Sequence, residues 1–222
     1  MIADSLRLRF VFATLTFVVI WNGINSLFKA GWIYATISTG LVLAADIIYL
    51  VRTRDNLFMR IFVFSLIAGF IELFADRWFV QSMQILVYPP GEPMIWHSPL
   101  YMPFAWTIVL VQLTTIGWWL LKHCKVRSAS LAAAFIGAAN IPLYEEWARG
   151  ANWWSYRNTA MIGHTPWGII IAEALIALTL PIAVRFFQSR RMAVSALLGV
   201  AQGFWMLAAC VIAFQIIGFL AK

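Results

Sequence analysis

Residues 57–77 read L-F-M-R-I-F-V-F-S-L-I-A-G-F-I-E-L-F-A-D-R, a stretch dominated by large apolar side chains. A helix needs about 20 mostly apolar residues to cross the hydrocarbon core of a bilayer, and this stretch has that length. It therefore predicts a transmembrane helix. Its two carboxylates, Glu72 and Asp76, are unusual in such a setting.

Six more stretches have a similar length and composition: 8–28, 31–51, 98–121, 129–147, 165–187 and 193–220. The 222-residue chain is 63% hydrophobic and only 11% charged, whereas a soluble domain is about half apolar. The links are short, and the sequence shows no internal repeat. We predict an all-α polytopic membrane protein in which residues 1–222 form a single bundle of seven transmembrane helices.

The basic residues predict how this bundle is oriented. With a cytoplasmic N-terminus, 11 of the 16 Lys and Arg residues fall on the inner side, as the positive-inside rule requires. The C-terminus is then outside, and the compact chain suggests a bacterial inner membrane. Because the basic residues are scattered singly, the net charge of +7 does not indicate a nucleic-acid partner.

The intramembrane carboxylates need an explanation, because insertion scales put the cost of a charge in hydrocarbon at roughly 2.5–3.5 kcal/mol. With a rise of about 1.5 Å per residue, Glu72 lies about 8 Å inside the outer end of its helix, Asp76 at that end, and Glu173 about 12 Å inside its own helix. Glu145 and Glu146 close the fifth helix on the same side. These five residues are the predicted catalytic groups.

Residues Ser65, Gly69, Glu72 and Asp76 recur at helical spacing, so they predict one small and polar face that looks into the bundle. The links 78–97 and 148–164 lie at the same outer end. The first is amphipathic and broken by prolines, which suggests an interfacial segment or a lid. The predicted substrate-binding residues, from these links and the helix ends, are Asn22, Asn25, His97, Asn140, Tyr144, Trp147, Arg149, Trp153, Trp154 and His164.

The same carboxylates could have structural roles in place of catalytic ones. Glu72 and Asp76 could form ion pairs with Arg77, Arg149 or Arg157, and Glu145 is one helical turn before Arg149. The histidines lack the spacing of a metal site, so we predict no metal and no cofactor. The seventh helix has no lysine for a retinal Schiff base.

The segment I-P-L-Y-E-E-W at residues 141–147 resembles the segment of proline and paired glutamates in membrane-embedded lycopene cyclases. Tyr144 intrudes between Pro142 and Glu145, where the motif of those enzymes is tighter. The chain is also similar in size to the small seven-helix terpene cyclases, which use membrane carboxylates. The resemblance implies an isoprenoid substrate, with Glu145 and Glu146 serving ring closure.

Three functions follow from these patterns. The first is a membrane enzyme that cyclises, isomerises or hydrates an isoprenoid or another lipid, since a buried carboxylic acid can protonate an alkene or epoxide and aromatic faces can stabilise the resulting cation. The second is a non-catalytic or pigment-binding subunit of a larger membrane complex. The third is a proton-coupled transporter, with Asp46 near the inner side and Glu173 as stations.

Overall fold

The computed structural model describes residues 2–220 and the side chains of residues 4–219. Within this part of the chain, seven helices are long and apolar enough to cross a membrane: Asp4–Phe28, Trp32–Thr53, Asn56–Ser82, Met102–Leu121, Val126–Ala151, Trp167–Phe187 and Met192–Phe219. Each overlaps one predicted stretch. The all-α prediction is therefore confirmed, and the seven apolar helices suggest an integral membrane protein.

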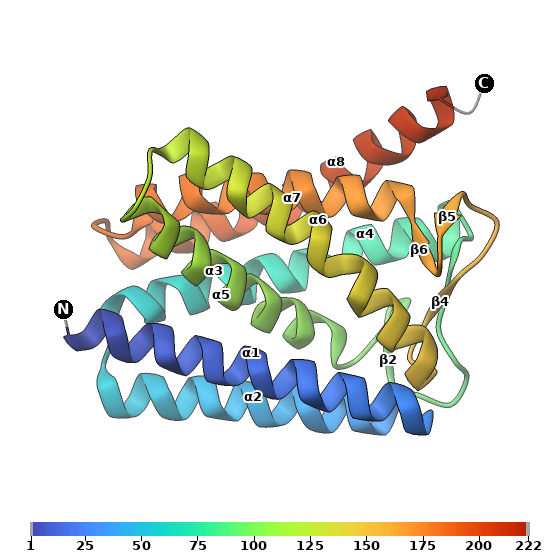
Figure 1. Ribbon diagram of the computed structural model, residues 1–222, viewed down its shortest axis with the longest axis horizontal. Helices are drawn as coiled ribbons and strands as arrows, with labels where there is room; N and C mark the ends of the chain where they lie inside the picture. The colour runs from blue at the N-terminus through green and yellow to red at the C-terminus, as the bar shows by residue number, and fades with distance from the viewer. Residues whose placement is uncertain (1, 221–222) are drawn as a thin grey trace.

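The helices form an antiparallel bundle with α5 (Met102–Leu121) near its centre (Figure 1). α5 contacts α3 (Asn56–Ile71), α6 (Val126–Ala151) and α7 (Trp167–Phe187). α8 (Met192–Leu220) packs on α3 and α7, whereas α1 (Ile2–Phe28) and α2 (Trp32–Thr53) lie side by side at the opposite edge. We call the end that holds the long links 83–101 and 152–166 the link end, and the opposite end the N-terminal end.

The third membrane helix is irregular. It consists of α3, a one-residue break at Glu72, α4 (Leu73–Arg77) and a π-helical turn, η1 (Trp78–Ser82). The prediction that this helix ends near residue 77 is wrong, because Trp78 and Phe79 are packed against Phe214 of α8 and carry the helix one turn further. Asp76 consequently lies inside the helix, not at its end.

Glycines allow α3 to approach both of its neighbours closely. A Cβ atom at Gly69 would lie 2.4 Å from the carbonyl oxygen of Pro103 in α5. In α8, a Cβ at Gly199 would lie 2.6 Å from the carbonyl oxygen of Phe64, and one at Gly203 would lie 2.5 Å from the Cβ of Ile71. The two glycines of α8 thus form a G-x-x-x-G contact, a spacing that brings membrane helices close together.

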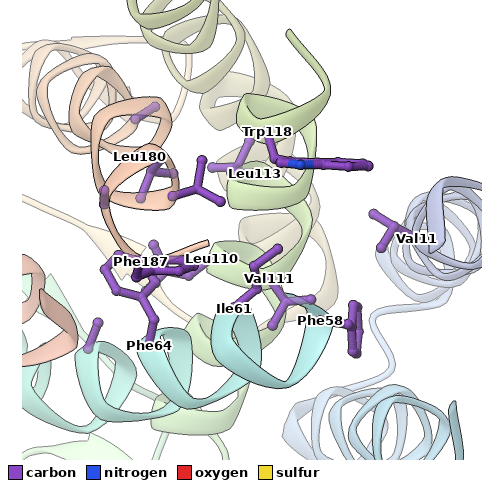
Figure 2. Packing of buried hydrophobic residues seen from close by; sticks show 14 of the residues in the cluster. Val11, Phe58, Ile61, Phe64, Leu110, Val111, Leu113, Trp118, Leu180 and Phe187 are labelled. Atoms are coloured by element: carbon purple, nitrogen blue, oxygen red, sulfur yellow. The ribbon is translucent and has the colours of Figure 1, made fainter. Parts of the chain in front are cut away.

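The apolar core fills the half of the bundle nearer the N-terminal end (Figure 2). Phe58, Ile61 and Phe64 of α3 lie there with Leu110 of α5 and Phe187 of α7, and all five are fully buried. Phe64 and Phe187 are in direct contact, with ring centroids 5.2 Å apart. Toward the link end this close packing gives way to cavities.

A polar network joins helices at the N-terminal end. The Arg7 guanidinium donates two hydrogen bonds to the Asp55 carboxylate, at 2.7 and 2.8 Å, and stacks over Trp118. Asp55 also caps α3 by accepting hydrogen bonds from the backbone N–H groups of Leu57 and Phe58. One carboxylate therefore connects the start of α3 with α1.

Short antiparallel strand pairs organise the links. β1 (Leu86–Val87) pairs with β4 (Ser155–Tyr156), which ties the two long links together, while β2 (Met94–Ile95) pairs with β3 (Ser98–Pro99) and β5 (Met161–Ile162) with β6 (Thr165–Pro166). These strands lie on the right in Figure 1. The prediction of one interfacial segment over 78–97 is wrong for residues 78–82, which are part of the membrane helix.

Candidate functional site

Four of the five predicted catalytic carboxylates line one cavity at the link end of the bundle. Glu72 and Asp76 come from the third membrane helix, Glu145 from α6 and Glu173 from α7. The centre of a water-sized sphere can move through about 110 Å³ of this cavity, so the space between its wall atoms is larger. All four side chains are buried. The structure therefore brings these four carboxylates together, as the sequence predicted.

Helical spacing explains why these residues meet. The third membrane helix lines the cavity with Glu72, Ala75, Asp76 and Phe79, and α7 does so with Ile169, Ala172, Glu173 and Ile176. Residues separated by three and four positions share a helix face. The helical spacing of small residues and acids therefore predicted correctly which face of the third membrane helix looks into the bundle.

Glu72 and Asp76 sit where the helix is irregular. Asp76 accepts a 2.7 Å hydrogen bond from the Tyr88 hydroxyl, whereas Oε2 of Glu72 is buried without a hydrogen-bond partner. Breaks and π-helical turns in membrane helices are frequent at functional sites. The ion pairs expected with Arg77, Arg149 or Arg157 are not formed by either carboxylate among the described side chains.

Glu145 is held by aromatic donors, not by Arg149. It accepts hydrogen bonds from Nε1 of Trp154 at 2.7 Å and from the Tyr156 hydroxyl at 3.3 Å. The expected Glu145–Arg149 ion pair at an exposed helix end is wrong. Glu145 is only 4% exposed, and Arg149 lies on the outside of the protein, because the link that follows α6 folds back over the inner face of that helix.

Glu173 is positioned by close packing of α6 on α7. A Cβ atom at Gly137 of α6 would lie 2.8 Å from the backbone oxygen of Glu173 and equally close to the Cβ of Ala177. Pro142 follows in the same helix and lacks a backbone N–H for the helical hydrogen bond. Among the described residues, no basic side chain lines the cavity and balances these acids.

Glu146 lies outside the cavity that the preceding residue, Glu145, lines. It is exposed, and its carboxylate holds His164 through the ring Nδ1 at 2.7 Å and through the backbone N–H at 2.9 Å. Glu146 therefore does not share the cavity with Glu145, since adjacent residues on a helix point about 100° apart. Its contacts instead hold the β5–β6 turn against the end of α6.

The predicted binding residues divide into three groups. Asn140, Tyr144 and Trp154 line the acidic cavity, and Asn22 and Trp153 line a second cavity beside it. The remaining predicted residues line neither: Asn25, His97, Trp147, Arg149 and His164. Asn25 instead donates a hydrogen bond to the backbone oxygen of Trp21, and His97 lies in the turn between β2 and β3.

Several residues of the cavity were not predicted. Trp106 of α5, Tyr88 after β1 and Tyr156 of β4 all contribute to its walls. The antiparallel pairing of β1 with β4 brings both tyrosines over the carboxylates. Clustered aromatics in a link are ordinary at a membrane interface, so the sequence carries no signal that separates these side chains from surface ones.

The tyrosines of the links are suited to donate hydrogen bonds. Burial, together with the nearby Asp76 carboxylate, raises the pKa of Tyr88 well above its usual value. Burial and the neighbouring Glu145 raise the pKa of Tyr156 in the same way. Both hydroxyls therefore stay protonated at neutral pH and orient the carboxylates that they contact.

Other candidate groups lie apart from this site. Asp46 is buried in α2 with Oδ2 unpartnered, and it lines neither cavity. In the described part of the chain, no group of three or more His, Cys, Asp and Glu residues is arranged to hold a metal ion. The described lining of the cavity offers carboxyl groups, tyrosine hydroxyls, aromatic faces, the Asn140 amide and the Cys210 thiol.

Comparison with known protein families adds one finding to this geometry. A family model described as "Domain of unknown function (DUF6989)" matches residues 73–217. The chain belongs to this family. The matched region of the family contains Asp76, Glu145 and Glu173, but it begins one residue after Glu72 and leaves out α1 and α2. No curated protein and no solved structure matches the chain.

Proposed function

We propose that the protein is a membrane-embedded enzyme that performs acid–base chemistry on an isoprenoid or another lipid. The observation that carries the proposal is the convergence of Glu72, Asp76, Glu145 and Glu173 in a mostly apolar cavity without a basic residue in its described lining. A carboxyl group buried without a cation is most stable as the neutral acid, which is the form that donates a proton.

The reaction that fits is a proton transfer to an alkene or epoxide. One carboxylic acid protonates the substrate, and the aromatic walls, including Trp106 and Tyr144, stabilise the carbocation that results. A second carboxylate then removes a proton from carbon, which completes a cyclisation or an isomerisation. Addition of water to the cation, followed by proton loss, completes a hydration instead.

Glu72 is the best candidate for the proton donor. Its Oε2 is buried with no hydrogen-bond partner, whereas Asp76 and Glu145 are oriented by tyrosine and tryptophan donors. This oxygen, having no protein partner, is free to form its hydrogen bond with substrate. The resemblance of residues 141–147 to lycopene cyclases agrees with a role for Glu145 in the same chemistry.

The orientation and location also belong to this proposal. The distribution of basic residues favours a cytoplasmic N-terminus and an outward C-terminus, which places the cavity in the outer half of the membrane. We propose a bacterial inner membrane as the location. A lipid substrate could then enter the site without leaving the bilayer.

The test uses the full chain in lipid nanodiscs made with D₂O. The probe is the alkene geranylgeraniol, and mass spectrometry measures products that carry carbon-bound deuterium, because protonation of an alkene forms a bond from carbon to deuterium. Wild-type protein should form such a product, and Glu72→Gln and Glu173→Gln should each lower its rate at least about a hundredfold, as expected for the loss of an acid–base group.

Glu146→Gln is the matched control, because this glutamate lies outside the cavity. It should retain most of the wild-type rate. Full conversion by both Glu72→Gln and Glu173→Gln would overturn the proposal. Lipid extraction of the purified protein, followed by mass analysis, would show whether a different isoprenoid or a pigment occupies the site.

A further inference from the structure

A second cavity adjoins the acidic one and has a different chemical character. The centre of a water-sized sphere can move through about 60 Å³ of it, and it lies between α1, α2 and α5. Four residues line both cavities: Ala105, Val109, Tyr144 and Trp154. These four residues, which we call the junction, lie between the two cavities.

The junction has one wall of small side chains. Ala105 and Val109 are separated by four positions in α5, so they lie on one helix face. Tyr144 faces the same two cavities from α6. A hydrocarbon chain of a ligand that extends from one cavity to the other would therefore lie along a narrow apolar face of α5 and beside the ring of Tyr144.

The second cavity suits an uncharged hydrocarbon. Val18, Val42 and Ile108 form its apolar floor, and its described lining contains no charged residue. Its polar groups are neutral: the Ser38 hydroxyl donates to the backbone oxygen of Ala35, and the Tyr101 hydroxyl is buried without a hydrogen-bond partner. A lipid phosphate would find no charged partner in this lining, whereas a hydrocarbon tail needs none.

The acidic cavity also excludes anionic groups. A diphosphate placed among Glu72, Asp76, Glu145 and Glu173 would meet several carboxyl groups and no basic side chain in the described lining. Anion sites in proteins are built from Arg, Lys or clustered backbone N–H groups. The substrate must therefore be neutral at the end that reacts.

We propose that the two cavities hold one elongated and neutral isoprenoid, with its reactive end among the four carboxyl groups and its apolar tail across the junction in the second cavity. This inference rests on the proposed function, which it extends to the substrate class. The inference also means that α1 and α2, which line the second cavity, determine the length of isoprenoid that binds. Both helices lie outside the region matched by the family model.

Binding of prenyl alcohols tests this inference without requiring turnover. The probes are geraniol, farnesol and geranylgeraniol, a series of increasing length, each with a photoreactive diazirine at the tail end. Nanodisc-bound protein is irradiated, and peptide mass spectrometry locates the crosslinks. Geranylgeraniol should label residues of α1 or α2 near Val18 and Val42, whereas geraniol should label only the acidic cavity.

Two variants fill the tail site. Val42→Trp should weaken geranylgeraniol binding at least about tenfold and leave geraniol binding unchanged, since each buried methylene group contributes appreciably to affinity. Ala105→Phe should close the junction with the same length-dependent result. Leu41→Trp is the control, because Leu41 precedes Val42 in the same helix but is 51% exposed.

The outcomes separate the two proposals. Equal binding of all three alcohols by Val42→Trp and Ala105→Phe, or tail crosslinks outside α1, α2 and the junction, would overturn the second-cavity assignment. If either variant fails to fold, as judged by thermal unfolding, the other variant and the wild-type crosslinks still show whether the tail binds in the second cavity. A length-dependent binding pattern without any deuterated product would contradict the enzymatic proposal alone.

Discussion

Glu145 illustrates how the site is assembled at the scale of single residues. Its carboxylate accepts hydrogen bonds from Trp154 and Tyr156, and both donors belong to the segment that follows its own helix. A hydrogen bond between neutral groups contributes about 0.5–1.5 kcal/mol, so two such contacts fix the direction of the carboxyl group. Glu145 is oriented toward the cavity as a consequence.

Glu92 gives a test of pH dependence outside the membrane-spanning helices. It is 7% exposed, both carboxylate oxygens lack hydrogen-bond partners, and burial raises its pKa from 4.5 to about 7. The folded protein therefore binds this proton more tightly than the unfolded chain does. The stabilising effect of protonation is fully present below about pH 4.5 and is lost as the pH rises to about 7.

We expect Glu92→Gln to remove this contribution. The difference in melting temperature between about pH 5 and about pH 8 should be smaller in the variant than in the wild type, because glutamine does not titrate in this range. Thermal unfolding in detergent micelles measures the difference. An unchanged pH dependence in Glu92→Gln would show that Glu92 is not the group responsible.

At the scale of elements, the contact of α8 with α3 determines where the acids sit. Gly203 lies against Ile71, the residue before Glu72. In membranes, close backbone approach and van der Waals packing hold helices together, because lipid offers no hydrophobic driving force between them. A larger residue at this position must displace α3 close to the break that carries Glu72.

Gly203→Val should therefore lower both stability and activity. Overpacking at a tight contact costs typically about 1–3 kcal/mol, and the shift of α3 should reduce the rate of deuterated product formation as well. Gly218→Val is a matched control on the same helix, since a Cβ at Gly218 would meet no atom within 4 Å. Equal melting temperatures and rates for the two variants would contradict this account of the α3–α8 contact.

At the scale of the whole molecule, the bundle is tied together by different means at its two ends. The N-terminal end has the ion pair of Arg7 with Asp55, whose side chains are only 4% and 5% exposed. Lys122 at the end of α5 also pairs with Asp4 and lies over Trp118. The link end instead has paired strands and the cavity with four buried carboxyl groups, so the buried ion pair and the candidate acid–base groups are separated along the bundle.

Asp55→Asn tests the stabilising role of this ion pair. Asparagine keeps the ability to cap α3, so the variant mainly removes the buried charged partner of Arg7 and leaves only the partly exposed Asp4 beside it. Removing one partner of a buried pair costs roughly 3–5 kcal/mol, which should appear as a large loss of thermal stability. Arg9→Met should have little effect because Arg9 is exposed, and a similarly small effect of Asp55→Asn would contradict the role assigned to the pair.

The sequence by itself determined the seven helices and the end of the bundle at which the acids gather. The length of an apolar run and the rise of a helix are local properties, so they place Glu72, Glu145 and Glu173 without knowledge of packing. The helical spacing of Gly69, Glu72 and Asp76 likewise fixed the inward face of the third membrane helix.

Only the tertiary structure decided which polar groups share a site. Glu145 faces the cavity and Glu146 faces outward because the rotation of α6 is set by its packing on α7 at Gly137. The aromatic donors and the second cavity depend on how distant segments fold over one another. Such contacts join residues far apart in the chain, so no local pattern of length, spacing or composition specifies them.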